Sequence, residues 1–147
     1  KKVKGVTAGK VVAAYGIMRG IFGAFNVGFG GVAGFIRPVV LPMAEAAIEN
    51  GGNKATEEHI EDVKGMASAM ENVTWFFFQV LFVGGAGGIL VQTTLAGLGY
   101  EVELIDLAVT EIPVAIFALI LACAFVVIKD KKMQQKYYGN SAKTTKK

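Results

Sequence analysis

The sequence predicts an all-α protein: a polytopic membrane helix bundle whose first segment is broken or re-entrant. Three stretches without Asp, Glu, Lys or Arg support this fold class, with 29 residues at 72–100, 17 at 112–128 and 17 at 20–36. A helix needs about 20 mostly apolar residues to cross a hydrocarbon core roughly 30 Å thick. One long apolar helix could also form the centre of a soluble domain, but three such stretches in one chain favour a membrane.

The first segment, residues 10–48, is expected to be an interrupted membrane segment. Residues 26–31, Asn-Val-Gly-Phe-Gly-Gly, would make a poor continuous helix, and Pro38 and Pro42 each lack a backbone donor. Irregular backbone at membrane depth persists only where it is buried in protein or lines a cavity. Discontinuous helices of this kind often form the substrate site of secondary transporters.

Four elements are expected after the first segment. A polar surface helix at 49–71 is capped by Thr56, transmembrane helices follow at 72–98 and 104–128, and the tail at 129–147 is basic and disordered. Together with the first segment they would form a single membrane domain over the whole chain. Because the chain does not begin with Met, we expect it to be the C-terminal part of a longer protein.

The charges are unevenly distributed along the chain. The tail carries seven lysines against one aspartate, and segment 49–71 carries six acidic residues against two lysines. Lysines directly after an apolar span follow the positive-inside rule, so we expect a multi-pass protein of the cell membrane with a cytoplasmic tail. The expected partner is therefore the lipid bilayer, and we do not expect the chain to bind nucleic acid. A re-entrant first segment would keep the four N-terminal lysines on the cytoplasmic side as well.

Arg37 is the most suggestive single residue. An arginine at the centre of a spanning helix costs about 3 kcal/mol, so such a residue usually has a partner or a function. Arg37 could hold the carboxylate of a small anionic substrate through two parallel hydrogen bonds. Alternatively, it lies at the membrane surface or pairs with Glu45. Glu45 in turn could carry a coupling ion or proton, or could mark the start of the acidic surface.

Three other polar side chains in the apolar segments each allow two interpretations. Arg19 is a second anion contact, or a flanking residue whose charge reaches the membrane surface. Asn26 binds substrate, or only completes the turn in the glycine-rich break. Gln79 is an amide among aromatic residues, and it contacts a ligand or hydrogen-bonds a neighbouring helix.

Three pairs of glycines, each separated by four positions, predict close helix packing. They are Gly16 with Gly20, Gly30 with Gly34, and Gly84 with Gly88. Because glycine has no side chain, such pairs let two helix backbones approach each other in a membrane. They indicate a bundle or an oligomer rather than an activity.

The sequence does not indicate an enzyme. It has no Gly-x-x-x-x-Gly-Lys-Ser/Thr nucleotide loop, and the single histidine, His59, lies in the polar segment. No metal-ligand cluster and no nucleophilic triad can be assembled, so neither a metal site nor a cofactor is expected. Cys123, the one cysteine, is expected to be a small buried apolar residue.

Several stretches of the chain resemble a known prokaryotic family. They are residues 7–10 (Thr-Ala-Gly-Lys), Tyr15 and Arg19, residues 37–45 (Arg-Pro-Val-Val-Leu-Pro-Met-Ala-Glu), and residues 71–73 (Glu-Asn-Val) followed by Phe76 and Phe77. They resemble the smaller-numbered of two domain-of-unknown-function membrane families that are encoded together and are described as the two subunits of a 5-oxoproline (pyroglutamate) transporter. One departure is at positions 78–79, where many relatives have Gly-Glu and this chain has Phe-Gln.

The resemblance implies an integral membrane subunit of a secondary transporter for a small carboxylate, with 5-oxoproline as substrate. The implied partner is a larger co-encoded membrane subunit. Arg37 or Arg19 would then hold the carboxylate, and Asn26 or Gln79 would complement the lactam. The alternative is a scaffold or assembly subunit that does not transport and whose glycine faces bind the partner.

Overall fold

The computed structural model describes residues 5–139, and these residues form helices and loops with no strand among them. In chain order the elements are α1 (Ala8–Ala24), the π-helix η1 (Val32–Val40), α2 (Leu41–Asn50), α3 (Glu57–Phe78), the 3-10 helix η2 (Gln79–Leu81), α4 (Ala86–Gly97) and α5 (Leu104–Tyr138). The prediction of an all-α fold is confirmed for this part of the chain.

Two threonines set where α1 and α3 begin. The Thr7 hydroxyl accepts a hydrogen bond from the Lys10 amide at 3.4 Å, and the Thr56 hydroxyl accepts one from the His59 amide at 3.3 Å. Each bond satisfies one of the backbone donors that a helix start leaves unpaired. The Thr56 cap was expected from the sequence.

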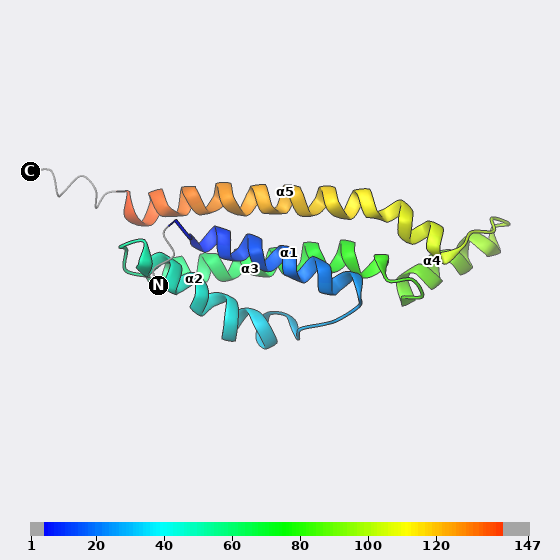
Figure 1. Cartoon of the computed structure of the whole chain (residues 1–147), viewed down its shortest axis with the longest axis horizontal. Helices are drawn as coiled ribbons and strands as arrows, with labels where there is room; N and C mark the ends of the chain where they lie inside the picture. Colours follow the sequence, from blue (N-terminus) through cyan, green and yellow to red (C-terminus); the bar gives the residue numbers. More distant parts are fainter. Residues whose placement is uncertain (1–4, 140–147) are drawn as a thin grey trace, which may run out of the picture.

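Three long helices form the bundle, with α1 and α3 parallel to each other and α5 antiparallel to both (Figure 1). Gly16 lies against Met70 and Gly20 against Phe78. Residue numbers therefore increase in the same direction along α1 and α3. On the other side of α1, Gly9 lies against Asp130 of α5. Between α1 and α3, η1 and α2 carry the chain back to the end of the bundle from which α1 starts.

The first segment is interrupted, but not at its prolines. The chain turns through residues 25–31, where Asn26 has φ +57° and Gly31 has φ +60°, in the left-handed region. Pro38 lies inside η1, where the chain is wound as a π-helix, and Pro42 lies in the first turn of α2, where a missing donor costs little. The glycine-rich break is therefore the real interruption.

The structure divides the next part of the chain differently from the expectation. α3 runs without a break across residue 72, so residues 57–71 of the polar helix expected at 49–71 and the start of the helix expected at 72–98 are one element, while residues 49–50 end α2. The boundary fails because one buried stripe, which includes Val63 and Met70, continues past residue 72 to Thr74. The second half is instead split, since η2 and a turn at Gly84 (φ +87°) bend the chain by 56° before α4.

The described part of the tail is helical rather than disordered. α5 continues from the apolar run through residues 129–138, and Tyr137 and Tyr138 at its end pack on the first turn of α3. These aromatic contacts give the basic segment a surface to fold against. Residues 140–147, the rest of the expected disordered tail, lie outside the described residues.

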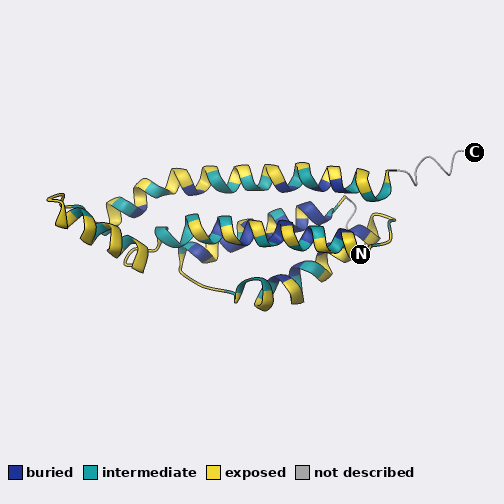
Figure 2. Ribbon diagram, turned by 180° about the vertical axis from the view of Figure 1, so that it is seen from behind, coloured by how far each residue is buried: buried dark blue, intermediate teal, exposed yellow. Residues whose placement is uncertain are grey.

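The bundle has a mainly apolar outer surface. α5 is long and apolar enough to cross a membrane, with 11% of its most apolar stretch buried, and it is about 52 Å long. α3 with η2 and α4 form a second candidate if the bent pair is one span. Figure 2 shows exposed residues along α4 and the outer face of α5, where Ile112, Ile116 and Ile120 are exposed. Exposed apolar surface on this scale marks contact with lipid or protein.

Candidate ion-pair site

The most unusual feature of the interior is a buried group of three polar side chains. Arg19 is 2% exposed and Glu71 is 7% exposed, and both oxygens of Glu71 lie 2.9 Å from Nε of Arg19. The Tyr15 hydroxyl donates a hydrogen bond to the same carboxylate. One helix supplies the cation and the phenol, and the neighbouring helix supplies the anion.

Helical spacing brings these three residues together. Tyr15 and Arg19 are four positions apart and therefore lie on one face of α1, which also carries Gly16. A Cβ added at Gly16 would lie 2.3 Å from Sδ of Met70, so the absence of a side chain there allows α1 and α3 to approach closely. Glu71 directly follows Met70, and its carboxylate reaches both polar groups of α1.

Aromatic rings and one carbonyl enclose the rest of the Arg19 guanidinium. Its central carbon lies 4.2 Å from the ring centre of Trp75 and 5.6 Å from that of Phe29. A cation over an aromatic face is attracted to it, more strongly where water is excluded. Nη1 donates to the carbonyl of Val27 at 3.2 Å, so the loop 25–31 is tied to the ion pair.

A cavity reaches the group from the side of η1 and α2. It has a volume of about 450 Å³, and its lining includes Tyr15, Phe35, Val39 and Met43, with Lys10 as its one charged residue. Phe35 stacks on Tyr15 with ring centres 5.6 Å apart. The ion pair is therefore separated from this cavity by the Tyr15 ring.

Arg37 and Glu45 lie away from this interior. Both side chains are exposed, Arg37 on η1 and Glu45 on α2, and no ion pair joins them among the described residues. The interpretation of Arg37 as the partner of Glu45 is therefore wrong for this part of the chain. Arg19, by contrast, is buried with a partner and does not extend to the surface as a flanking residue would.

Asn26 lies in the loop just after α1, and Gln79 begins η2 just after α3. Asn26 is exposed and has a left-handed backbone in the loop next to Val27, which fits its interpretation as a turn residue. Gln79 is half-buried and follows Phe78, whose ring and Cβ lie against Gly20 and Gly23. Arg19, Asn26 and Gln79 thus belong to one end of the α1–α3 pair, and Arg37 is on the segment that returns from it.

The three glycine pairs have different surroundings. Gly16 and Gly20 lie at the contact between α1 and α3. Gly34 lies where a Cβ would meet the Phe29 carbonyl oxygen at 2.6 Å, so the second pair serves the turn into η1 instead of a contact between helices. Gly84 forms the bend before α4, and a Cβ at Gly88 would make only an ordinary contact at 3.6 Å with Leu104. Spacing alone did not distinguish packing from turn formation.

A second polar cluster lies at the opposite end of α3. His59 is buried beside Tyr138, whose hydroxyl lies 2.9 Å from Nδ1 of the imidazole. Burial lowers the pKa of His59 below its usual range, and the negative charges of Asp130 and Asp62 oppose this shift in part. Hydrogen bonds from the Tyr137 hydroxyl and from a lysine lower the pKa of the Asp62 carboxyl. This cluster joins the end of α5 to the start of α3 and contains no candidate metal site among the described residues.

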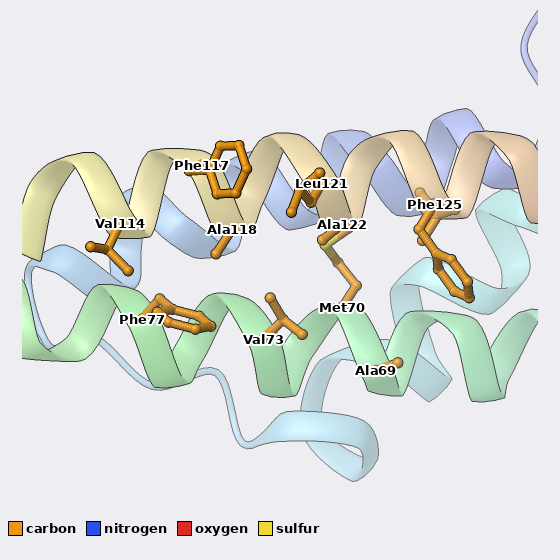
Figure 3. Close-up of a pocket in the computed structure, with 11 residues that line it drawn as sticks. Ala69, Met70, Val73, Phe77, Val114, Phe117, Ala118, Leu121, Ala122 and Phe125 are labelled. Carbon is orange, nitrogen blue, oxygen red and sulfur yellow. The ribbon is translucent and has the colours of Figure 1, made fainter.

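A groove between α3 and α5 lacks any group that could hold an anion. It has a volume of about 490 Å³, and Figure 3 shows apolar side chains from both helices pointing into it. They include Val73 and Phe77 from α3, with Val114 and Phe125 from α5. Such a surface suits a lipid chain or an apolar helix, and it leaves the Arg19 group as the candidate anion site.

The sequence contained a signal for Glu71 that the charge pattern obscured. Positions 63, 67, 70, 71 and 74 repeat at helical spacing, so Glu71 falls on the buried stripe of α3. An acidic residue on an apolar stripe is expected to have a buried partner. The charge pattern instead places Glu71 at the end of a polar surface helix, where no buried partner is expected.

A family model described as "Protein of unknown function (DUF969)" matches residues 1–134 of the chain. No curated protein and no solved structure matches the chain.

Proposed function

We propose that this chain, which belongs to the DUF969 family, is an integral membrane subunit of a secondary transporter for a small carboxylate, with 5-oxoproline as substrate. One observation carries the proposal: Arg19, at 2% exposure, is buried inside a mainly apolar helical bundle. A guanidinium keeps its charge at any physiological pH and binds carboxylates through well-oriented hydrogen bonds. A buried cation of this kind in a membrane is usually functional.

The proposed location is the cell membrane, with the end that holds the lysine-rich C-terminal segment in the cytoplasm. α5 would cross the bilayer once and the bent α3–α4 pair once more, which makes a polytopic bundle. α1 would enter from the cytoplasmic side, and η1 with α2 would return to it, so the first segment is re-entrant. This arrangement keeps the start of α1 and the end of α5 on one side, as the positive-inside rule favours.

The substrate chemistry fits the residues at the far end of α1 and α3. The carboxylate of 5-oxoproline would bind Arg19, and its lactam would bind Asn26 or Gln79, since each amide offers both a donor and an acceptor. Arg37 and Glu45 are exposed on the outer face of the first segment. A larger co-encoded subunit that covers this face would contact both, Arg37 as a second anion contact and Glu45 as an ion-coupling group.

Uptake of labelled 5-oxoproline tests the proposal. Cells expressing the full-length protein together with its co-encoded partner should accumulate the label, and cells expressing either alone should not. Excess unlabelled 5-oxoproline should compete, whereas pyrrolidin-2-one, which has the lactam without the carboxylate, should not. Arg19→Lys and Arg37→Lys should each lower uptake at unchanged membrane insertion. Absence of uptake with both subunits inserted would refute the assigned substrate.

A scaffold or assembly subunit is the second candidate, and the apolar groove of Figure 3 favours it. On this hypothesis the outer faces of α3 and α5 bind the helices of a partner permease, and the chain contacts no substrate. Substitutions at Gly84 and Gly88 should then disrupt the complex, while Arg37→Ala is tolerated. Co-purification of the partner with each variant, measured beside uptake, separates the two candidates.

A further inference from the structure

We propose that Glu71 carries the proton that drives transport, and that a small carboxylate enters the site by replacing Glu71 at Arg19. This inference rests on the proposed function for the identity of the anion. It names the coupling ion as a proton and adds Glu71 as the residue that carries it, in place of Glu45. The starting observation is that the candidate anion-binding residue is already occupied by a carboxylate of the protein itself.

Charge makes the two carboxylates exclusive. Both oxygens of Glu71 already lie 2.9 Å from Nε of Arg19, inside a buried site. Two ionised carboxylates beside one guanidinium would leave a net negative charge in an apolar interior, which is strongly unfavourable. A substrate anion can therefore bind Arg19 only if the Glu71 charge is neutralised or removed.

Protonation of Glu71 balances the exchange. Before binding, one guanidinium faces one carboxylate of the protein, and after binding it faces one carboxylate of the substrate. One proton passes from hydronium in the aqueous phase to Glu71, so an O–H bond breaks in hydronium and one forms on the carboxylate, and the net charge of the site stays the same. The Tyr15 hydroxyl donates to Glu71 in the resting state and can donate to the carbonyl oxygen of the protonated acid, which holds that side chain in place.

Few other titratable groups face this exchange. From α1, Glu71 is contacted by Tyr15 and Arg19. Two titratable groups of α5 lie against α1: Cys123, whose Sγ lies 3.9 Å from the Ala13 carbonyl oxygen, and Asp130, which lies beside Gly9 near the start of α1. η1 presents the apolar ring of Phe35 to Tyr15, and the charged side chains of η1 and α2 are exposed. Glu71 is thus the acidic group that Arg19 holds in the described chain.

Two groups of residues cover the site, one on each side. On one side, the Tyr15 ring separates the ion pair from the cavity that Lys10 borders, and a lysine at this position attracts anions. On the other side, the loop 25–31 covers the guanidinium through Val27 and Phe29. A site between two thin barriers suits alternating access, in which each barrier opens in turn.

Trp75 provides a built-in reporter for the exchange. It is the one tryptophan of the chain, and its ring centre lies 4.2 Å from the central carbon of the Arg19 guanidinium. Exchange of the anion at Arg19 changes the charges next to the indole and therefore its fluorescence. The chain in nanodiscs would be titrated with 5-oxoproline and with acetate, and pyrrolidin-2-one would serve as the uncharged control. A Trp75→Phe variant identifies the signal that belongs to this site.

The expected result is a saturable change whose apparent Kd falls as the pH is lowered, by up to about tenfold for each pH unit, because binding takes up one proton. Calorimetry of the unmodified chain in buffers with different ionisation enthalpies should give one proton taken up per carboxylate bound. Glu71→Gln should bind carboxylate with no dependence on pH, and Glu61→Gln, a change at an exposed glutamate of the same helix, should keep the wild-type slope.

Proton uptake near zero in the unmodified chain, or a pH slope retained in Glu71→Gln, would overturn the inference. The measurement on the unmodified chain does not depend on whether that variant folds. Acetate binding with proton uptake, without any response to 5-oxoproline, would support the role of Glu71 while refuting the assigned substrate. No response to either carboxylate would refute both proposals, and uptake without a proton requirement would refute only this one.

Discussion

Removal of the Glu71 carboxylate alone should destabilise the protein far more than removal of an exposed carboxylate from the same helix. In Glu71→Ala the Arg19 guanidinium stays buried, at 2% exposure in the native chain, without a counter-charge. Loss of one partner from a buried ion pair costs about 3–5 kcal/mol, and the Tyr15 hydroxyl loses its acceptor as well. Because both costs arise in one network they do not add fully, and we expect a loss of about 4–5 kcal/mol.

The matched control is Glu61→Ala. Glu61 lies in α3 too, and one of its carboxylate oxygens pairs with Nζ of Lys64 at 2.8 Å, but its side chain is 63% exposed. An exposed pair contributes about 0–1 kcal/mol because water screens it. The difference between the two variants thus isolates the effect of burial from the helix propensity of alanine.

A variant without any of the three polar groups should recover most of the loss. Tyr15→Phe, Arg19→Met and Glu71→Leu together replace a buried polar network by apolar side chains of similar size, which is often neutral or stabilising. We expect its free energy of unfolding to return to within about 1 kcal/mol of the native value. Carboxylate binding should nevertheless be abolished, which separates the stability of the group from its proposed function.

The assay is equilibrium unfolding in mixed micelles with increasing SDS, followed by helical circular dichroism. The free energy of unfolding falls linearly with denaturant, so the midpoints of the four proteins can be compared at a common slope. If Glu71→Ala and Glu61→Ala lose the same free energy, the ion pair is not buried in the assembled protein. The argument for a buried anion site would then fail as well.

Three further predictions follow from other contacts. Gly9→Ala should lower the free energy of unfolding by about 1–3 kcal/mol, because the new Cβ would lie 2.4 Å from a side-chain atom of α5. Gly65 has open space around it, so Gly65→Ala should leave the free energy of unfolding unchanged or raise it by up to about 1 kcal/mol in the same assay. The pKa of His59 is lowered in the folded chain, so its contribution to stability is complete above about pH 6.5 and is lost as the pH falls below that value. The melting temperature should therefore drop between pH 7.5 and 5.5, and His59→Asn should reduce that drop; an equal drop in the variant would contradict the assignment. In a protein without its native cysteine, nitroxide labels would be attached in detergent to Ile120→Cys and Ala115→Cys before transfer to a bilayer. Dissolved oxygen, which concentrates in lipid, should relax the label at position 120 much more strongly, since that position is exposed and position 115 is buried; equal relaxation would contradict a lipid-facing α5.

Local patterns in the sequence predicted the parts of the fold that depend on local physics. The uncharged run at 112–128 became the centre of α5, Thr56 caps α3, and the glycine-rich stretch at 26–31 forms the interruption of the first segment. In each case the relevant energy comes from neighbouring residues: apolar composition, a capping hydroxyl, or a backbone that glycine tolerates. The end of the helix at Phe78 could not be placed, because the aromatic run around it has no strong helix breaker before Gly84.

The candidate site depends on contacts that no local pattern contains. Arg19 and Glu71 are 52 positions apart, and their pairing requires the return of the chain through η1 and α2. Charge patterning assigns a carboxylate to the surface, and only the buried stripe of α3 indicates otherwise. The opposite error occurred at Arg37, which the sequence singled out because it stands among apolar residues, while the structure leaves it exposed on η1.

The bend after α3 has a consequence for how the chain folds. None of the residues of α4 is buried, whereas α1, α3 and α5 share one core, so the free energy that orders α4 comes almost entirely from its own short helix and a few contacts with α5. A helix of 12 residues has little stability on its own. α4 therefore forms a separate folding unit of low local stability, which can unfold and refold while the rest of the bundle stays intact. Its order therefore depends on what packs against its exposed faces rather than on the core of this chain.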